Sequence, residues 1–220
     1  MQRDVGFAAL MARTFANLRL VWWQLLAYLS VATGLAFAGQ LAGQLVGDEP
    51  IGLVGLGLYF AGQYWLFHAL LKARGLVETP RIHIFAFVGL AAVLIFPIMF
   101  GFALFVLPGL VLVARYIAAP SYVVARGDGA FAAAISSWRA VRGYTLPIAG
   151  AAALMFIGVS LIGGLIGGIG GLLAGFGTDR VAQPIDVIEM QLIPLLLFAL
   201  STATYELLGP QDNAIEEVFG

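Results

Sequence analysis

Cysteine is absent from this chain, histidine occurs twice, and charged residues make up only 10% of the 220 positions. Without cysteine, disulfides, thiol catalysis and thiolate metal sites are excluded. We interpret His68 and His83, which show no metal-ligand spacing, as polar residues at a membrane boundary. Soluble domains carry about 25% charged residues. Because so few charges cannot cover a surface in water, lipid must be the solvent.

Apolar residues dominate, at 61% of the chain. A membrane-spanning helix needs about 20 mostly apolar residues, and the alternation typical of β-barrel strands is missing. We therefore predict an all-α, polytopic membrane helix bundle, a single domain over residues 1–220. It has about six transmembrane helices and two interfacial amphipathic helices. The spans are expected at about 20–46, 51–71, 82–106, 109–125, 144–176 and 185–208.

The long stretch 82–125 is divided at Pro108-Gly109, because proline cannot continue a helix and glycine tolerates a tight turn. Lys and Arg favour cytoplasmic loops. With six spans and both termini cytoplasmic, nine of the eleven basic residues lie inside: Arg3, Arg13, Arg19, Lys72, Arg74, Arg81, Arg126, Arg139 and Arg142. The alternative is a signal peptide cleaved near Ala36-Phe37-Ala38.

Residues 5–18 and 129–142 are interpreted as amphipathic helices and not as spans. In the first, Phe7, Leu10, Met11, Phe15 and Leu18 form a helical stripe, and in the second Phe131, Ile135 and Trp138 do. Such helices lie in the membrane surface. Four arginines are therefore candidates for lipid headgroup contact: Arg13, Arg19, Arg139 and Arg142. Simple anchoring is the alternative, and the two segments also align loosely as an internal repeat.

Arg115 falls inside the fourth predicted span. A charge there is costly, so it is expected to face the bundle interior or a partner. We predict an intramembrane polar site in which Arg115 pairs with Glu189 of the sixth span, with Asp186 as the second choice. Snorkelling of Arg115 alone, or a ligand or ion site, are the alternatives. Gln63 and Gln191 either line a polar path or bridge helices.

The fifth predicted span is rich in glycine. Small residues four apart let helix backbones approach closely, and Gly163, Gly167, Gly171 and Gly175 form such a ridge. It predicts tight helix packing, with homo-oligomer contact as the alternative. So many glycines also make a break near 163–171 conceivable.

Three stretches carry a family resemblance. They are 107–120, which contains Leu107-Pro108-Gly109 and Ala114-Arg115-Tyr116, then 123–127, and then 134–143 with Ser136-Ser137-Trp138. This pattern resembles the membrane domain of the glycerophosphoryl diester phosphodiesterase family and the related YciC-like bacterial inner-membrane proteins. The resemblance implies a six-helix inner-membrane domain and a structural role for Pro108, Gly109, Arg115 and Trp138. In those phosphodiesterases the chemistry resides in a separate soluble barrel, so no catalytic residue is implied.

The function expected from these observations is non-catalytic. The chain is interpreted as a multi-pass protein of the bacterial inner (cytoplasmic) membrane that organises lipids or serves as an accessory subunit of a membrane complex. Its expected partners are membrane phospholipids, and a membrane complex or a second copy of itself, with no nucleic acid, cofactor or metal. The alternative is a transporter of a small solute or lipid that uses Arg115 and Glu189. A lipid-modifying enzyme would need catalytic groups from another chain.

Overall fold

The computed structural model describes residues 6–46, 48–174 and 179–209. Side chains are described at most of these positions, but at none from 40 to 51 or from 173 to 190. Over the described residues the chain is all-helical. The helices are α1 (Phe7–Leu20), α2 (Trp22–Val46), α3 (Asp48–Ala73), α4 (Ile84–Leu104), α5 (Val106–Tyr116), α6 (Ala119–Arg126), α7 (Ala130–Ala140), α8 (Thr145–Ala174) and α9 (Asp179–Leu208).

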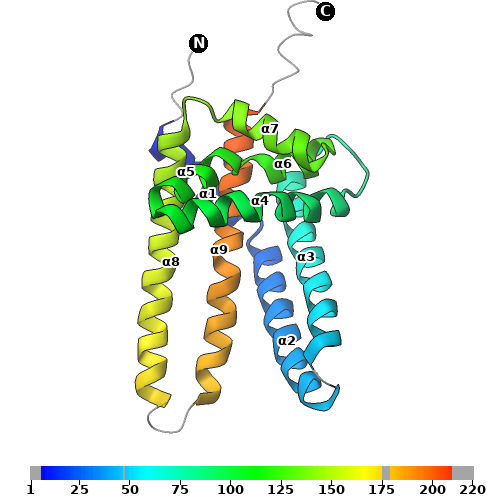
Figure 1. Ribbon diagram of the computed structural model, residues 1–220, viewed down its shortest axis with the longest axis vertical. Helices are drawn as coiled ribbons and strands as arrows, with labels where there is room; N and C mark the ends of the chain where they lie inside the picture. Colours follow the sequence, from blue (N-terminus) through cyan, green and yellow to red (C-terminus); the bar gives the residue numbers. More distant parts are fainter. Residues whose placement is uncertain (1–5, 47, 175–178, 210–220) are drawn as a thin grey trace, which may run out of the picture.

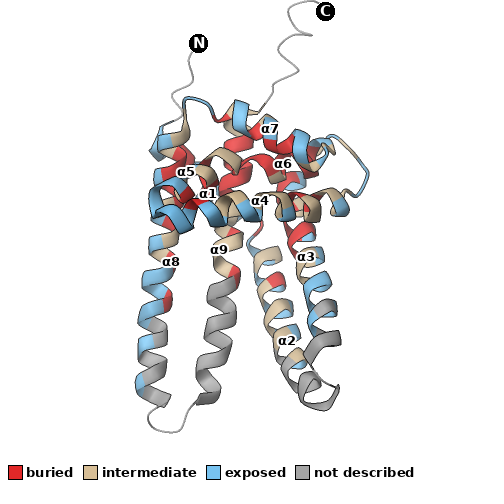
Figure 2. Ribbon diagram, in the orientation of Figure 1, coloured by how far each residue is buried: buried red, intermediate tan, exposed pale blue. Residues whose placement is uncertain are grey.

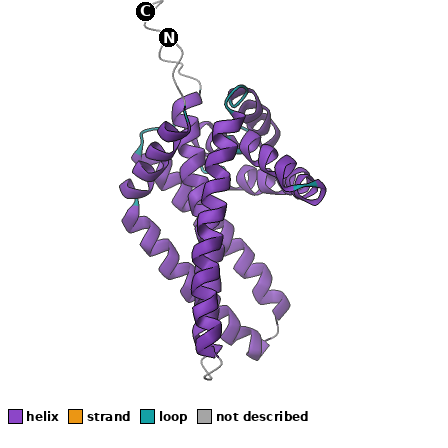
Figure 3. Ribbon diagram, turned by 90° about the vertical axis from the view of Figure 1, so that its left-hand side faces the viewer, coloured by secondary structure: helices purple, strands orange, loops and turns teal. Residues whose placement is uncertain are grey.

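The long helices form two antiparallel pairs, α2 with α3 and α8 with α9 (Figure 1). Helix α4 runs across these pairs at one end of the molecule (Figure 1). The view turned by 90° shows the shorter helices gathered at that same end (Figure 3). Helices α5, α6 and α7 pack with α4, and α1 meets α2 at a bend of 71°. We call α1 and α4–α7 the end layer. The two helix pairs extend from this layer like legs.

The two helices predicted at the membrane surface are present as α1 and α7. Their apolar stripes, which we expected to face lipid, are largely exposed. Leu10, Thr14 and Asn17 are buried on α1, whereas Phe7 and Phe15 are exposed. The reason is that α1 packs its partly polar face against α9. On α7, all three stripe residues are exposed.

The chain turns between α4 and α5 at Phe105, three residues before the predicted break at Pro108-Gly109. Phe105 is extended, with φ −164°. Pro108 lies in the first turn of α5, where its missing N–H would have no helical partner anyway. A Cβ on Gly101 would lie 3.0 Å from the Cα of Gly109. Gly109 therefore allows α4 and α5 to approach closely and is not part of the turn.

Buried residues concentrate in the end layer and in the leg segments that pass through it (Figure 2). One cluster joins α3, α4, α6 and α7 around Phe67, Leu71 and Leu90. A second joins α1, α5, α8 and α9 around Leu10, Ile148 and Leu200. Many of the buried positions are alanine, which allows the short helices to approach closely.

Four helical stretches are long and apolar enough to cross a membrane: Ile84–Leu104, Val106–Arg126, Thr145–Leu165 and Gln191–Leu208. The bent pair α1 and α2 makes a fifth if it is counted as one span. The all-helical membrane character that we predicted is therefore present. Helix α8 is continuous through Ala174, without a break at 163–171.

Candidate functional site

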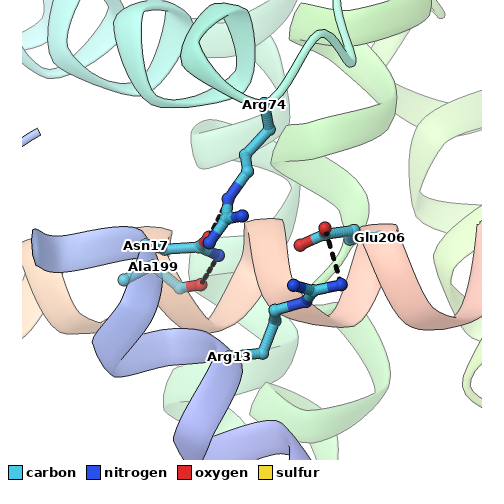
Figure 4. A network of polar contacts seen from close by, with 5 residues as sticks. All are labelled: Arg13, Asn17, Arg74, Ala199 and Glu206. Atoms are coloured by element: carbon cyan, nitrogen blue, oxygen red, sulfur yellow. Dashed lines mark hydrogen bonds and ion pairs between the residues drawn. The ribbon is translucent and has the colours of Figure 1, made fainter. Parts of the chain in front are cut away.

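A network of polar side chains joins α1, the turn that follows α3, and α9 (Figure 4). The Nε of Arg74 donates to Oδ1 of Asn17 at 2.6 Å, and Nδ2 of Asn17 donates to the carbonyl of Ala199 at 3.4 Å. Asn17 is fully buried, so both of its amide atoms need partners. The network therefore fixes α1 against α9 and the turn that follows α3.

One helical turn before Asn17, Arg13 forms an ion pair with Glu206 near the end of α9. Its Nη2 lies 3.2 Å from Oε1 of Glu206. The Arg13 side chain is 44% exposed and that of Glu206 is 18% exposed. The second oxygen of Glu206 is buried, with no hydrogen-bond partner among the described residues. Arg13 therefore compensates a carboxylate that water reaches poorly.

Hydroxyl groups line the same stretch of α9. Ser201, Thr202 and Thr204 are buried, and Ser201 shares a hydrogen bond of 2.9 Å with Ser121 of α6. Thr202 donates to the carbonyl of Phe198, one turn earlier. Oγ1 of Thr204 has no partner among the described residues. This polar surface is therefore sealed between helices rather than open to a substrate.

The loop between α3 and α4 closes over the end of α6. The backbone N–H of Glu78 donates to the carbonyl of Ala125 at 2.8 Å, and the hydroxyl of Tyr205 lies 3.4 Å from Oε1 of Glu78. Arg126 lies 4.0 Å from the other Glu78 oxygen. Helix α6 ends at Arg126 and is capped by Gly127, whose positive φ of 76° suits glycine. These contacts hold Glu78 close to Arg126 at the end of α6.

Arg115 lies beside Trp138 of α7. Its guanidinium carbon is 4.9 Å from the centre of the Trp138 ring, and its Nη1 donates to the Trp138 carbonyl at 3.4 Å. Ser137 in turn donates to the carbonyl of Arg115 at 2.9 Å. The predicted partner Glu189 has a side chain outside the described part of the chain. The pairing of Arg115 with Glu189 therefore stays a prediction, while the contact with Trp138 is established.

A lateral groove of about 470 Å³ lies between α2 and α3, in the leg rather than in the end layer. Aliphatic and small residues line it, together with Tyr28, Tyr59 and Gln191. At its edge the hydroxyl of Tyr28 donates to Oε1 of Gln191 at 2.8 Å, and Gln63 is buried on α3. Gln191 therefore bridges the two legs, as one of our two readings of it predicted.

The remaining predicted residues are spread over the molecule. Arg19, Arg139 and Arg142 are exposed in the end layer, whereas Arg13 is held by Glu206. Gly163 is buried on α8. Gly167 and Gly171 lie farther along the same helix, and Gly175 and Asp186 fall where no side-chain surroundings are described. No group of three or more His, Asp or Glu side chains that could hold a metal ion occurs among the described residues.

Comparisons with known proteins add no relative, since no protein-family model, curated protein or solved structure matches the chain. The resemblance to the phosphodiesterase membrane domain therefore stays a prediction.

Our sequence reasoning missed Asn17, Arg74, Glu206 and the Ser121–Ser201 pair. A signal was present, because the run Ser201-Thr202-Ala203-Thr204-Tyr205-Glu206 is too polar for a lipid-facing span end. Its partners come from distant helices, which the sequence alone does not bring together.

Proposed function

We propose that this chain is a non-catalytic integral membrane protein that organises phospholipids at the cytoplasmic face of a bacterial inner membrane. The observation that carries the proposal is the end layer, which combines basic side chains with large exposed apolar ones. On the α4–α5 hairpin, Phe96 is 78% exposed, Phe105 75% and Leu107 72%. Apolar surface of this extent is typical of contact with lipid.

The distribution of charge also supports lipid contact at this end of the molecule. All nine Lys and Arg side chains described belong to the helices of the end layer, to the loops next to these helices or to the adjoining end of α3: Arg13, Arg19, Lys72, Arg74, Arg81, Arg115, Arg126, Arg139 and Arg142. The described acidic side chains are three, Glu78, Asp128 and Glu206. Each basic residue near an anionic membrane surface contributes about 1 kcal/mol of attraction. This excess of positive charge supports an orientation in which this end of the molecule faces the cytoplasmic leaflet.

The orientation of α4 bears on the number of crossings. In the view of Figure 1, helices α2, α3, α8 and α9 run along the long axis and α4 runs across it. The view turned by 90° shows that two of the long helices are inclined to this axis (Figure 3). The long axis and the direction of α4 cannot both be normal to one bilayer. We therefore infer four crossings, by α2, α3, α8 and α9, in place of the six that we predicted from the sequence. The α4–α5 hairpin then lies in the membrane plane, although Ile84–Leu104 and Val106–Arg126 are apolar enough to cross.

The proposal includes an accessory role in a membrane complex. The exposed apolar side chains of α8, such as Leu161 and Leu165, offer a face for another membrane protein or a second copy of this chain. Its test begins with extraction into nanodiscs, followed by mass spectrometry of bound lipids and proteins. Enrichment of anionic phospholipid over the bulk membrane is expected, and a stoichiometric protein partner would place the function within that complex.

Transport is the second candidate, and the groove between α2 and α3 favours it. Tyr28 and Gln191 bring a polar pair into an apolar leg. Purified protein in liposomes gives the decisive comparison. Flux of a solute or lipid that the Gln191→Leu variant abolishes would replace the lipid-organising proposal with a transporter. Absence of flux together with lipid enrichment supports the first proposal.

A further inference from the structure

A second groove lies within the end layer, between α4 and α7, with a volume of about 290 Å³. Its walls are mostly apolar and come from three helices. They are Val93, Leu94 and Pro97 on α4, Tyr116 on α5, and Phe131, Ala134, Ile135 and Trp138 on α7. The exposed stripe of α7 thus forms one wall of a shaped groove rather than a flat surface.

Cationic groups border this groove at the Trp138 end. Arg139 lines it, and the Arg115 guanidinium lies over the Trp138 ring at 4.9 Å from its centre. The Tyr116 ring lies 5.3 Å from the Trp138 ring, centre to centre. Tyr and Trp favour the depth at which hydrocarbon meets headgroups. One end of the groove therefore has the composition of a membrane interface.

The acids do not offset this charge. Glu78, Asp128 and Glu206 are the described acidic side chains, and none of them lines the groove. Glu206 pairs with Arg13, and Glu78 is nearest to Arg126. Asp128 precedes α7, whereas Arg139 is near its end, so the helical rise from Ala130 to Arg139, about 14 Å, lies between them. An anionic group is therefore favoured near Arg115 and Arg139.

We propose that this groove holds one acyl chain of an anionic phospholipid of the surrounding leaflet, with its phosphate between Arg115 and Arg139. The inference rests on the proposed lipid-organising function and names its binding site. The apolar walls accept the chain, and guanidinium groups form bidentate hydrogen bonds with phosphate. The in-plane α4–α5 hairpin holds the groove at headgroup depth.

Trp138 provides a local probe of occupancy. Trp22, Trp23 and Trp65 are 52%, 65% and 52% exposed, so replacing each with Phe disturbs little packing and leaves Trp138 as the single tryptophan. This protein is placed in two kinds of phosphatidylcholine vesicle. One contains phosphatidylglycerol with brominated acyl chains, and the other contains phosphatidylcholine with brominated acyl chains. Bromine quenches tryptophan fluorescence on contact. We expect brominated phosphatidylglycerol to associate with an apparent constant about fivefold higher than brominated phosphatidylcholine.

Matched variants test whether the phosphate lies at Arg139 and the acyl chain in the groove. Arg139→Gln should abolish the preference, Arg139→Lys should retain most of it, and the exposed Arg81→Gln control should leave it intact. Ala134→Leu, which fills the groove, should lower quenching by both brominated lipids.

Equal quenching by the two lipids, or a preference that Arg139→Gln does not change, would overturn the site. Lipid enrichment in nanodiscs would then leave the proposed function standing. Failure of both measurements would remove the function together with the site.

Discussion

The Nη2 of Arg13 lies 3.2 Å from Oε1 of Glu206, which joins the first helix to the end of the last. These residues are 193 positions apart, the difference between 206 and 13. The pair holds α1 against the end of α9. The two half-buried charges therefore contribute to the architecture of the end layer.

Replacing Arg13 should destabilise the protein more than replacing Glu206. Arg13→Gln leaves the Glu206 carboxylate poorly solvated and should lower the free energy of unfolding by about 1–2 kcal/mol. Glu206→Gln removes the charge that needs compensation and should cost less. The measurement is thermal unfolding in detergent. In the double variant the losses should be less than additive, and strict additivity would show that the two side chains do not interact.

The Ser121–Ser201 hydrogen bond offers a second double-mutant cycle. Both side chains are buried, and their oxygens lie 2.9 Å apart. Either single change to Ala leaves a buried hydroxyl without this partner and should cost about 1 kcal/mol. The double change should be closer to the parent protein than the sum of the singles. A double variant as unstable as that sum would contradict the pairing.

The α4–α5 hairpin should not tolerate a methyl group at Gly101. A Cβ there would lie 2.7 Å from Cδ1 of Leu112 and 3.0 Å from the Cα of Gly109. Gly101→Ala should therefore destabilise the protein by about 1–3 kcal/mol. The destabilisation is observed as a lower midpoint temperature of thermal aggregation in detergent. Gly89→Ala is the matched control, since its nearest contact would be Ala130 at 3.9 Å. Equal midpoints for the two variants would refute the close approach.

The absence of cysteine makes accessibility mapping direct. If the hairpin lies in the membrane plane, Phe105→Cys should not react with an impermeant maleimide added outside intact cells. Six crossings would instead place Phe105 at the outer face, where it would be labelled. Gly52→Cys, at the far end of the α2–α3 leg, should be labelled from outside, and Arg81→Cys only after permeabilisation. Labelling of Phe105→Cys from outside would refute the in-plane hairpin.

The helices were largely predictable from the chain. The predicted interfacial segments 5–18 and 129–142 correspond to α1 and α7, and the predicted spans 144–176 and 185–208 to α8 and α9. Apolar run length and glycine or charged interruptions set these bounds, and both are local properties. The break at Phe105 was missed because proline in the first turn of a helix and proline in a turn look alike in sequence.

The candidate sites were less predictable. Arg115 and Trp138 were both singled out, and the family resemblance implied a structural role for each. Their contact was not predicted, because it depends on how α5 packs against α7. The Glu206 side chain was not considered, since its partner Arg13 was assigned to lipid headgroups. Pairs of this kind join residues far apart in the chain, and spacing carries no information about them.

By itself the amino-acid sequence determined that this protein is helical and lives in lipid, because too few charges are present to cover a surface in water and the apolar runs have helical length. The direction of α4 across the four long helices, the groove between α4 and α7, and the pairing of Arg13 with Glu206 were decided only by the tertiary structure. Hydrophobicity specifies the solvent of a helix but not its angle to its neighbours, and that angle follows from side-chain packing between distant segments.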